Sequence, residues 1–281
     1  MKRGILCLVL ILQIALVFAQ KDFSFVFLPD LHLLPDPKVE EGFDRLAKQV
    51  NNIHPDFIIT GGDMIYTAKN VDDKKAKVLF DLMDTELKKF NMPVYLTKGN
   101  HEIVGVLAES GIDSSNPWWG NRMFEQRYGN RYKSFIHSGW KFFLLDGIRI
   151  VEKARDYAQN VDAVQIEWIK RELQSTDKST PIVIVMHPPF ISPEAILSSK
   201  ERVMSKNSED VLNLFKGYNL KIVLFGHNHT YMNLYLHGIH YIEGGSASYG
   251  TPRFDDGFLL VKVKNNIEDI QFIHTDRNSK N

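Results

Sequence analysis

Apolar positions recur along the chain with two alternating periods, which predict strands separated by helices. Runs at 23–28 and 57–60 have the length and continuous apolar character of buried strands. Further along, a helical pattern of apolar residues ends near residue 90, and an apolar run predicts another strand at 94–97. Between the first two strands, apolar side chains repeat at the spacing of one helix face, at Phe43, Leu46, Ala47, Val50 and Ile53. The first third of the chain is therefore predicted to alternate strand and helix.

Further along, this alternation gives way to hairpins. Apolar runs predict three more strands, at 140–146, 182–186 and 220–225, with a helix from about 164 to 173 after the first of them. In the last part, paired apolar runs flank His237-Gly238 and Asn265-Asn266, a pattern typical of antiparallel β-hairpins. Parallel units followed by an antiparallel section predict an α/β fold in which two mixed sheets lie face to face with helices outside.

The first residues form a segment of their own. Lys2 and Arg3 precede an apolar stretch over 5–19, which ends in Val-Phe-Ala before Gln20. The pattern predicts a secretory signal peptide over 1–19, because the stretch is shorter than the roughly 20 apolar residues of a permanent membrane span. An uncleaved anchor is the alternative. Residues 20–281 are then predicted to form one exported domain without a transmembrane segment, in a periplasmic, secreted or other extracytoplasmic compartment.

The composition narrows the chemistry that such a domain can perform. Lys and Arg total 34, as do Asp and Glu, so the 281-residue chain has no net charge and no basic surplus for nucleic-acid binding. Its single cysteine, Cys7, lies in the predicted signal peptide, which excludes a disulfide scaffold, a thiolate metal site and a catalytic thiol. The ten histidines are the unusual feature. An anionic partner must therefore be attracted by a local charge.

Polar side chains follow five of the predicted strands at their carboxyl ends, the edge at which open α/β sheets build their sites. Imidazoles and carboxylates without thiolates suit zinc, manganese or iron. The polar residues are Asp30, His32, Asp63, Asn100, His101, His187, His227 and His229. These residues offer more candidate ligands than one tetrahedral metal site can use. A carboxylate among them could bridge two ions roughly 4 Å apart. Asp63 is the predicted bridge, and a pair of cations there would attract phosphate esters.

The order of these residues resembles the calcineurin-like metallophosphoesterase superfamily. Its blocks appear here between positions 30 and 229 as Asp-x-His, Gly-Asp, Gly-Asn-His-Glu, a lone His, and Gly-His-x-His. The resemblance implies a four-layer α/β/β/α sandwich with two mixed sheets. It also implies an enzyme that hydrolyses phosphate esters by a metal-bridging hydroxide, with two divalent or mixed-valence ions of manganese, iron or zinc as cofactors.

The same resemblance implies a role for each residue of the blocks. The first metal would be held by Asp30, His32, Asp63 and His229, and the second by Asp63, Asn100, His187 and His227. His101 would face the phosphate, where it stabilises the charge or protonates the leaving oxygen as the catalytic residue.

The branch of the superfamily and the substrate stay open. Asp30-x-His32 with His187-Pro188-Pro189 resembles the cyclic-nucleotide phosphodiesterases, whereas Gly62-Asp63 followed by Tyr66 resembles the purple acid phosphatases. In the latter the tyrosine ligates iron, but here His32 fills that position, so Tyr66 is interpreted as packing or pocket wall. The candidates are small phosphate mono- or diesters, nucleotides among them. An acid-phosphatase-like monoesterase is one alternative, and a non-catalytic, metal-loaded binding protein of the same fold is the other.

A segment between Glu102 and Arg131 is predicted to roof the site. Trp118 and Trp119 would stack on a base and Arg122 would meet phosphate, although the tryptophans serve equally well as loop anchors. A second wall is predicted over 188–208. The candidate substrate contacts are thus Asn100, His101, Tyr66, Trp118, Trp119 and Arg122, and the oligomeric state stays open.

Overall fold

The protein is described here by a computed structural model covering residues 21–192, 204–247 and 256–275. Its first sheet joins the early parallel strands to the last hairpin. The strand order is β13-β12-β1-β2-β3. β1, β2 and β3 run parallel, while β12 and β13 are antiparallel additions. The strands are β1 (Phe23–Leu28), β2 (Phe57–Thr60), β3 (Val94–Tyr95), β12 (Gly257–Lys264) and β13 (Ile267–His274).

The second sheet has the order β10-β11-β9-β8-β5-β4. Its inner strands are parallel and its two edge strands antiparallel. Its strands are β4 (Lys133–His137), β5 (Trp140–Leu145), β8 (Pro181–Met186), β9 (Asn219–Phe225), β10 (Tyr231–Leu236) and β11 (Ile239–Gly244). Two further strands, β6 (Ile148–Val151) and β7 (Asp156–Gln159), pair as a separate hairpin.

The two sheets pack face to face over an aromatic core. Phe25 and Phe57 of the first sheet stack with ring centroids 5.3 Å apart, and Phe142 of the second meets Phe25 edge-on at 5.5 Å. All three side chains are buried, together with the aliphatic residues of β8, β9 and β12. Aromatic pairs of this geometry add to the free energy gained by burying apolar area. This interior fixes the separation of the two sheets and hence the position of the loops at their ends.

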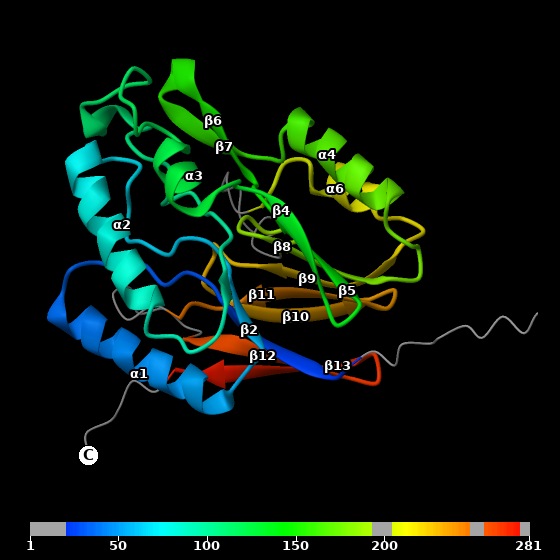
Figure 1. The fold of residues 1–281 in the computed structure, drawn as a ribbon. Coiled ribbons are helices and arrows are strands. Elements are labelled where there is room, and N and C mark those ends of the chain that lie inside the picture. The colour runs from blue at the N-terminus through cyan, green and yellow to red at the C-terminus, as the bar shows by residue number, and fades with distance from the viewer. Residues whose placement is uncertain (1–20, 193–203, 248–255, 276–281) are drawn as a thin grey trace, which may run out of the picture.

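Helices cover the outer faces of both sheets (Figure 1). α1, α2 and α3 pack on the first sheet, and α4 and α6 pack on the second. α1 begins after Asp36, whose carboxylate accepts a hydrogen bond from the Lys38 amide, with Pro37 in the first turn. The helices are α1 (Pro37–Ile53), α2 (Asp73–Leu87), α3 (Arg122–Tyr128), α4 (Ala163–Gln174) and α6 (Ser208–Leu214). The predicted four-layer α/β/β/α sandwich is confirmed.

The two predicted hairpins are confirmed, whereas one predicted strand is shorter than expected. Both predicted hairpins form, and Asn265 and Asn266 take φ values of 50° and 64°, as a two-residue hairpin turn requires. β3, however, is limited to Val94–Tyr95 instead of 94–97. The Thr97 amide donates to the Thr60 hydroxyl at 3.0 Å, so the chain leaves the backbone ladder early and turns toward the sheet edge.

The predicted signal peptide over 1–19 lies outside the described residues. The division into this segment and one domain over 20–281 therefore stays a prediction, as does export. Within the described ranges no helix combines the length and the apolar character needed to cross a membrane.

A buried ion pair fastens the two sheets together beside their carboxyl-terminal edge. Lys98, three residues after β3, lies 3.1 Å from an oxygen of Asp146, and the two side chains are 0% and 2% exposed. Asp146 directly follows β5, and its other oxygen accepts from Arg131 at 2.8 Å. Gln165 of α4 bonds both the amide and the carbonyl of Asp146. The ends of β3 and β5 and the start of α4 are therefore held as one unit.

Replacing Lys98 by Met should lower the free energy of unfolding by about 3 kcal/mol, because it leaves part of a buried negative charge uncompensated. Urea denaturation measures the change. Lys170→Met serves as a matched control, since Lys170 pairs with Glu167 on the exposed surface of α4 and its loss should leave the midpoint unchanged. Equal midpoints for Lys98→Met and the wild type would show that the pair does not fasten the sheets.

Candidate metal centre

The predicted ligands and His101 gather at the carboxyl-terminal edge of the two sheets. β1, β2, β3, β8 and β9 each lead into one of the loops that carry them. Three overlapping groups of side chains have their donor atoms within 4.8 Å of one another. They are Asp30, His32 and His229; His32, Asp63 and His101; and Asp63, His187 and His227.

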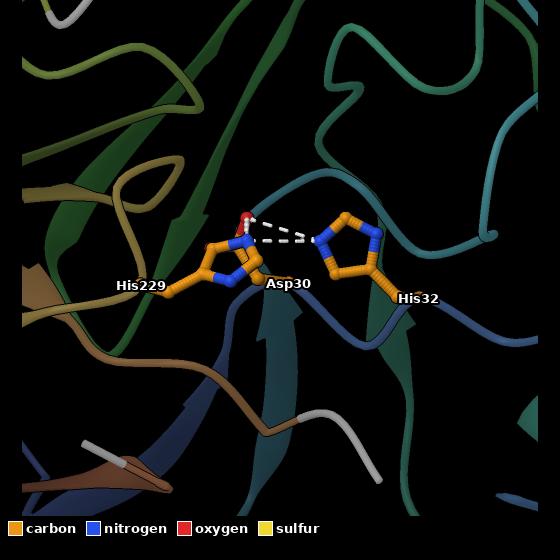
Figure 2. Close-up of side chains that lie close together, drawn as sticks. All are labelled: Asp30, His32 and His229. Carbon is orange, nitrogen blue, oxygen red and sulfur yellow. Dashed lines mark hydrogen bonds and ion pairs between the residues drawn. The ribbon is translucent and has the colours of Figure 1, made fainter. Parts of the chain in front are cut away.

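In the first group, three donor atoms point toward a common centre (Figure 2). Nε2 of His229 lies 3.3 Å from Oδ1 of Asp30, and Nε2 of His32 lies 3.9 Å from the same oxygen. The two imidazole nitrogens are 2.9 Å apart. All three side chains are buried, so the group is a compact set of one carboxylate and two imidazoles.

The third group is arranged around His187. Its Nε2 lies 3.1 Å from Oδ2 of Asp63, 3.1 Å from Oδ1 of Asn100 and 3.2 Å from Nδ1 of His227. The other ring nitrogen of His187 lies 2.8 Å from the Gly61 carbonyl oxygen. Since a carbonyl only accepts, Nδ1 carries a hydrogen, and the lone pair of neutral His187 is at Nε2, facing the group. Asn100 thus joins this group as predicted.

Asp63 connects the two ends of the cluster. Its carboxylate belongs to the group with His187 and His227 and also to the group with His32 and His101. His32 in turn belongs to the group around Asp30. This is the placement expected of a carboxylate that bridges two metal ions.

The donor set fits metal cations. Imidazole nitrogens 2.9 and 3.2 Å apart repel through their lone pairs unless a proton or a cation lies between them. Burial alone would raise the pKa of Asp63, but His101 and His187 outweigh it and hold that pKa well below its ordinary value. Burial alone would lower the pKa of His187, but the charge of Asp63 and its hydrogen bond outweigh burial and raise that pKa to about 9. The surroundings of Asp63 and His187 therefore favour a positive charge between them.

The backbone is strained at five of the predicted ligands. Five non-glycine ligands have left-handed φ values, a region that such residues seldom adopt. The values are 53° for Asp30, 48° for His32, 51° for Asp63, 82° for His227 and 62° for His229. Each costs about 1–3 kcal/mol and persists because the surrounding structure enforces it. The strain directs both side chains of a short motif such as Asp-x-His toward one point.

Two motif glycines allow the backbone to approach the ligand carboxylates. A Cβ on Gly99 would collide with Oδ1 and the amide of Asp63, and one on Gly226 would collide with Oδ2 of Asp30. The His227 amide can therefore donate to Asp30 at 3.0 Å. The glycines of Gly-Asn-His and Gly-His-x-His are thus required by contact with the ligands.

Two buried glutamates, neither predicted to have a role, hold the ligand loops. Glu102 accepts four backbone hydrogen bonds at 2.7–3.2 Å, from the amides of Asp63, Met64, Ile65 and Gly99. Glu243 on β11 accepts from the Asn228 amide at 3.1 Å. Glu102 stands in a recognised block, which gave a signal, but Glu243 lies in an ordinary strand and gave none.

A cavity of about 410 Å³ opens over the cluster. Its described lining residues are His32, Asp63, Tyr66, Thr67, Lys69, Asn70, His101, His227 and His229. Tyr66 is 44% exposed, which agrees with its interpretation as pocket wall. Lys69 places its Nζ 2.8 Å from Nε2 of His101. No sequence motif marks this lysine, so its position at the site could not be predicted.

The predicted roof residues make the contacts of a loop anchor. Trp119 is 6% exposed and its indole donates to the Gly105 carbonyl at 3.1 Å. Trp118 packs against the core under α1 and α2, and Arg122 donates to the carbonyls of Ser114 and Asn116. None of the three is among the described residues that line the cavity. Their assignment to substrate stays a prediction. Much of the predicted wall over 188–208 lies outside the described residues.

Comparison with known proteins identifies the class to which this chain belongs. Residues 23–231 match the family model described as calcineurin-like phosphoesterase, so the chain belongs to that family. A cyclic-nucleotide phosphodiesterase of Nostoc sp. is 21% identical over 234 residues, covering 80% of this chain and 79% of the relative.

Two further similarities concern phosphatases. Tartrate-resistant acid phosphatase type 5 of Mus musculus is 23% identical over 222 residues, covering 74% of this chain and 65% of the relative. A dimetal phosphatase of Danio rerio shares the fold with a TM-score of 0.65 at 13% identity, covering 89% of this chain and 95% of that one. The family and fold predictions are confirmed, whereas the assignment of each ligand stays a prediction.

Glu102→Gln should destabilise the protein by about 2 kcal/mol and weaken metal uptake. The side-chain NH2 of glutamine would face backbone amides that at present donate to a carboxylate oxygen, and those amides would lose their acceptor. Urea denaturation and metal analysis measure the two effects. Glu109→Gln is the control, since Glu109 is exposed in a short 3-10 turn. Unchanged stability in Glu102→Gln would contradict the role of this carboxylate in holding the loops.

Proposed function

We propose that the protein hydrolyses phosphate esters with two metal ions bound at this cluster. The observation that carries the proposal is the position of Asp63 between two groups of ligands. Asp30, His32, Asp63 and His229 would hold one ion, and Asp63, Asn100, His187 and His227 would hold the other. Bound ions of this kind supply an activated water at neutral pH and positive charge for the phosphoryl oxygens.

The chain's own contribution to the reaction centres on His101. Its Nδ1 bonds the carbonyl oxygen of Tyr66, so Nε2 is the ring nitrogen turned toward Asp63 and Lys69. Burial, with a further contribution from Lys69, lowers the pKa of His101 from its ordinary value. A phosphate dianion beside the ring would favour the protonated form again. His101 is thus suited to stabilise negative charge on the phosphoryl group and to protonate the leaving oxygen.

The substrate class is supported only in broad terms by the relatives. One is named as a phosphodiesterase and another as an acid phosphatase, so small phosphate mono- and diesters, including nucleotides, are the proposed substrates. The signal-peptide pattern over 1–19 supports a location outside the cytoplasm.

Asp63→Asn should reduce the bound metal from two ions per chain to one or none, because a neutral amide loses the charge and the bridging capacity of the carboxylate. The measurement is metal analysis after removal with a chelator and reconstitution with manganese, zinc or iron. Asp22→Asn, at the opposite end of β1, is a control for loss of one carboxylate. Two tightly bound ions in Asp63→Asn would contradict the bridging role.

His101→Ala should keep its metal content and lose about 100-fold in kcat toward p-nitrophenyl phosphate, since general-acid and charge-stabilising groups contribute effects of this size. Undiminished hydrolysis would remove His101 from the reaction. A metal-loaded wild type that hydrolyses neither p-nitrophenyl phosphate nor its bis ester would instead support the non-catalytic binding protein.

A further inference from the structure

Tyr66, Thr67, Lys69 and Asn70 form one part of the cavity wall, and backbone hydrogen bonds hold this segment in place. The Ala68 amide donates to the His101 carbonyl at 2.8 Å, and the Ala68 and Lys69 carbonyls accept from Gly105 and Leu107 at 2.9 and 2.8 Å. The segment is therefore bound both to His101 and to the loop at 105–107. The Lys69 side chain therefore lines the cavity from a backbone that is held in place.

The side chain of Lys69 has a defined position as well. Its Nζ lies 2.8 Å from Nε2 of His101 and 5.8 Å from the centre of the Tyr157 ring on β7. His101 Nδ1 faces the Tyr66 carbonyl, so Nε2 is the ring nitrogen that Lys69 contacts.

Charge distinguishes Lys69 from the other described residues of the cavity. The remaining described lining residues are histidines, one aspartate and neutral polar side chains, so Lys69 is the one lysine or arginine among them. A phosphate monoester carries close to two negative charges at neutral pH, because its second pKa is about 6, whereas a diester carries one. A cationic side chain at the wall therefore interacts more strongly with the monoester.

We propose that Lys69 binds a phosphoryl oxygen of the substrate and thereby makes phosphate monoesters the preferred substrate class. This inference rests on the proposed function. The hairpin β6–β7 supports a fixed position for Lys69. Tyr157 of this hairpin, which lies beside the Lys69 ammonium group, packs with Trp119 and Ile103 in one apolar cluster. Arg155 of the same hairpin donates to the carbonyls of Val106 and Leu107. Trp119 thus belongs to the apolar cluster that contains Tyr157, beside which Lys69 lies.

The test compares two substrates with the same leaving group on the metal-reconstituted full chain: p-nitrophenyl phosphate and methyl p-nitrophenyl phosphate. Lys69→Gln should lower kcat/KM for the monoester about 10- to 100-fold, mainly through KM, and change that for the diester less than about 3-fold. Lys69→Arg should keep most of the monoester activity. Lys178→Gln, which removes an exposed lysine between α4 and β8, should change neither substrate.

Binding of orthophosphate, measured by calorimetry, separates this inference from the proposed function. Its affinity should fall about 10-fold in Lys69→Gln and stay unchanged in Lys178→Gln. Equal losses for both esters, or no loss for either, would overturn the preference for monoesters. If the wild type hydrolyses neither ester yet binds orthophosphate through Lys69, the hydrolytic function fails while the anion site stands. Orthophosphate binding that is independent of Lys69 overturns the anion site even in an active enzyme.

Discussion

Negative charge crowded below the protein surface is the constraint on which the site depends. Asp30, Asp63, Glu102 and Glu243 are all at most 2% exposed. Burial, followed by repulsion from Asp63, raises the pKa of Glu102 to about 7, and burial with Asp30 raises that of Glu243 to about 8. The glutamates are compensated by backbone amides and the aspartates by imidazoles. Cations bound at the aspartates would relieve the repulsion on both glutamates at once.

The structure around these buried carboxylates holds the strained loops in place. Left-handed φ values at the predicted ligands and close contacts at the motif glycines are both unfavourable for the local backbone. The aromatic interior between the sheets supplies the rigidity that maintains them. Lys98 and Asp146 bring the ends of the two sheets together where those loops begin. Because Glu102 bonds amides of two different loops, a shift in either loop would move Asp63. Ligand geometry is therefore a property of the whole sheet edge.

Much of the layer architecture and the residues that gather at the site could be predicted from the sequence. Period and length distinguish strands from helices, and the ligands follow their strands directly in short motifs. The hairpin β6–β7 could not be predicted in this way, because Arg155 takes the left-handed turn position, at φ 51°, where a glycine or asparagine would have signalled a turn. Glu243 and Lys69 were missed because their roles arise from contacts between segments distant in sequence, which no local pattern records.

The predicted metal ligands and the residues of the cavity wall differ in the same way, because local motifs mark the first and contacts between distant segments place the second. The ligands stand at strand ends, where the sheets determine position, so a short motif is enough to identify them. The wall belongs to loops whose side chains are placed by mutual packing, and aromatic content there does not reveal which groups face the cavity. Trp119 is turned inward because its indole finds a backbone carbonyl and an apolar cluster. The ammonium group of Lys69 faces His101 at the cavity, and the proposed selection of substrate at this position would act through charge.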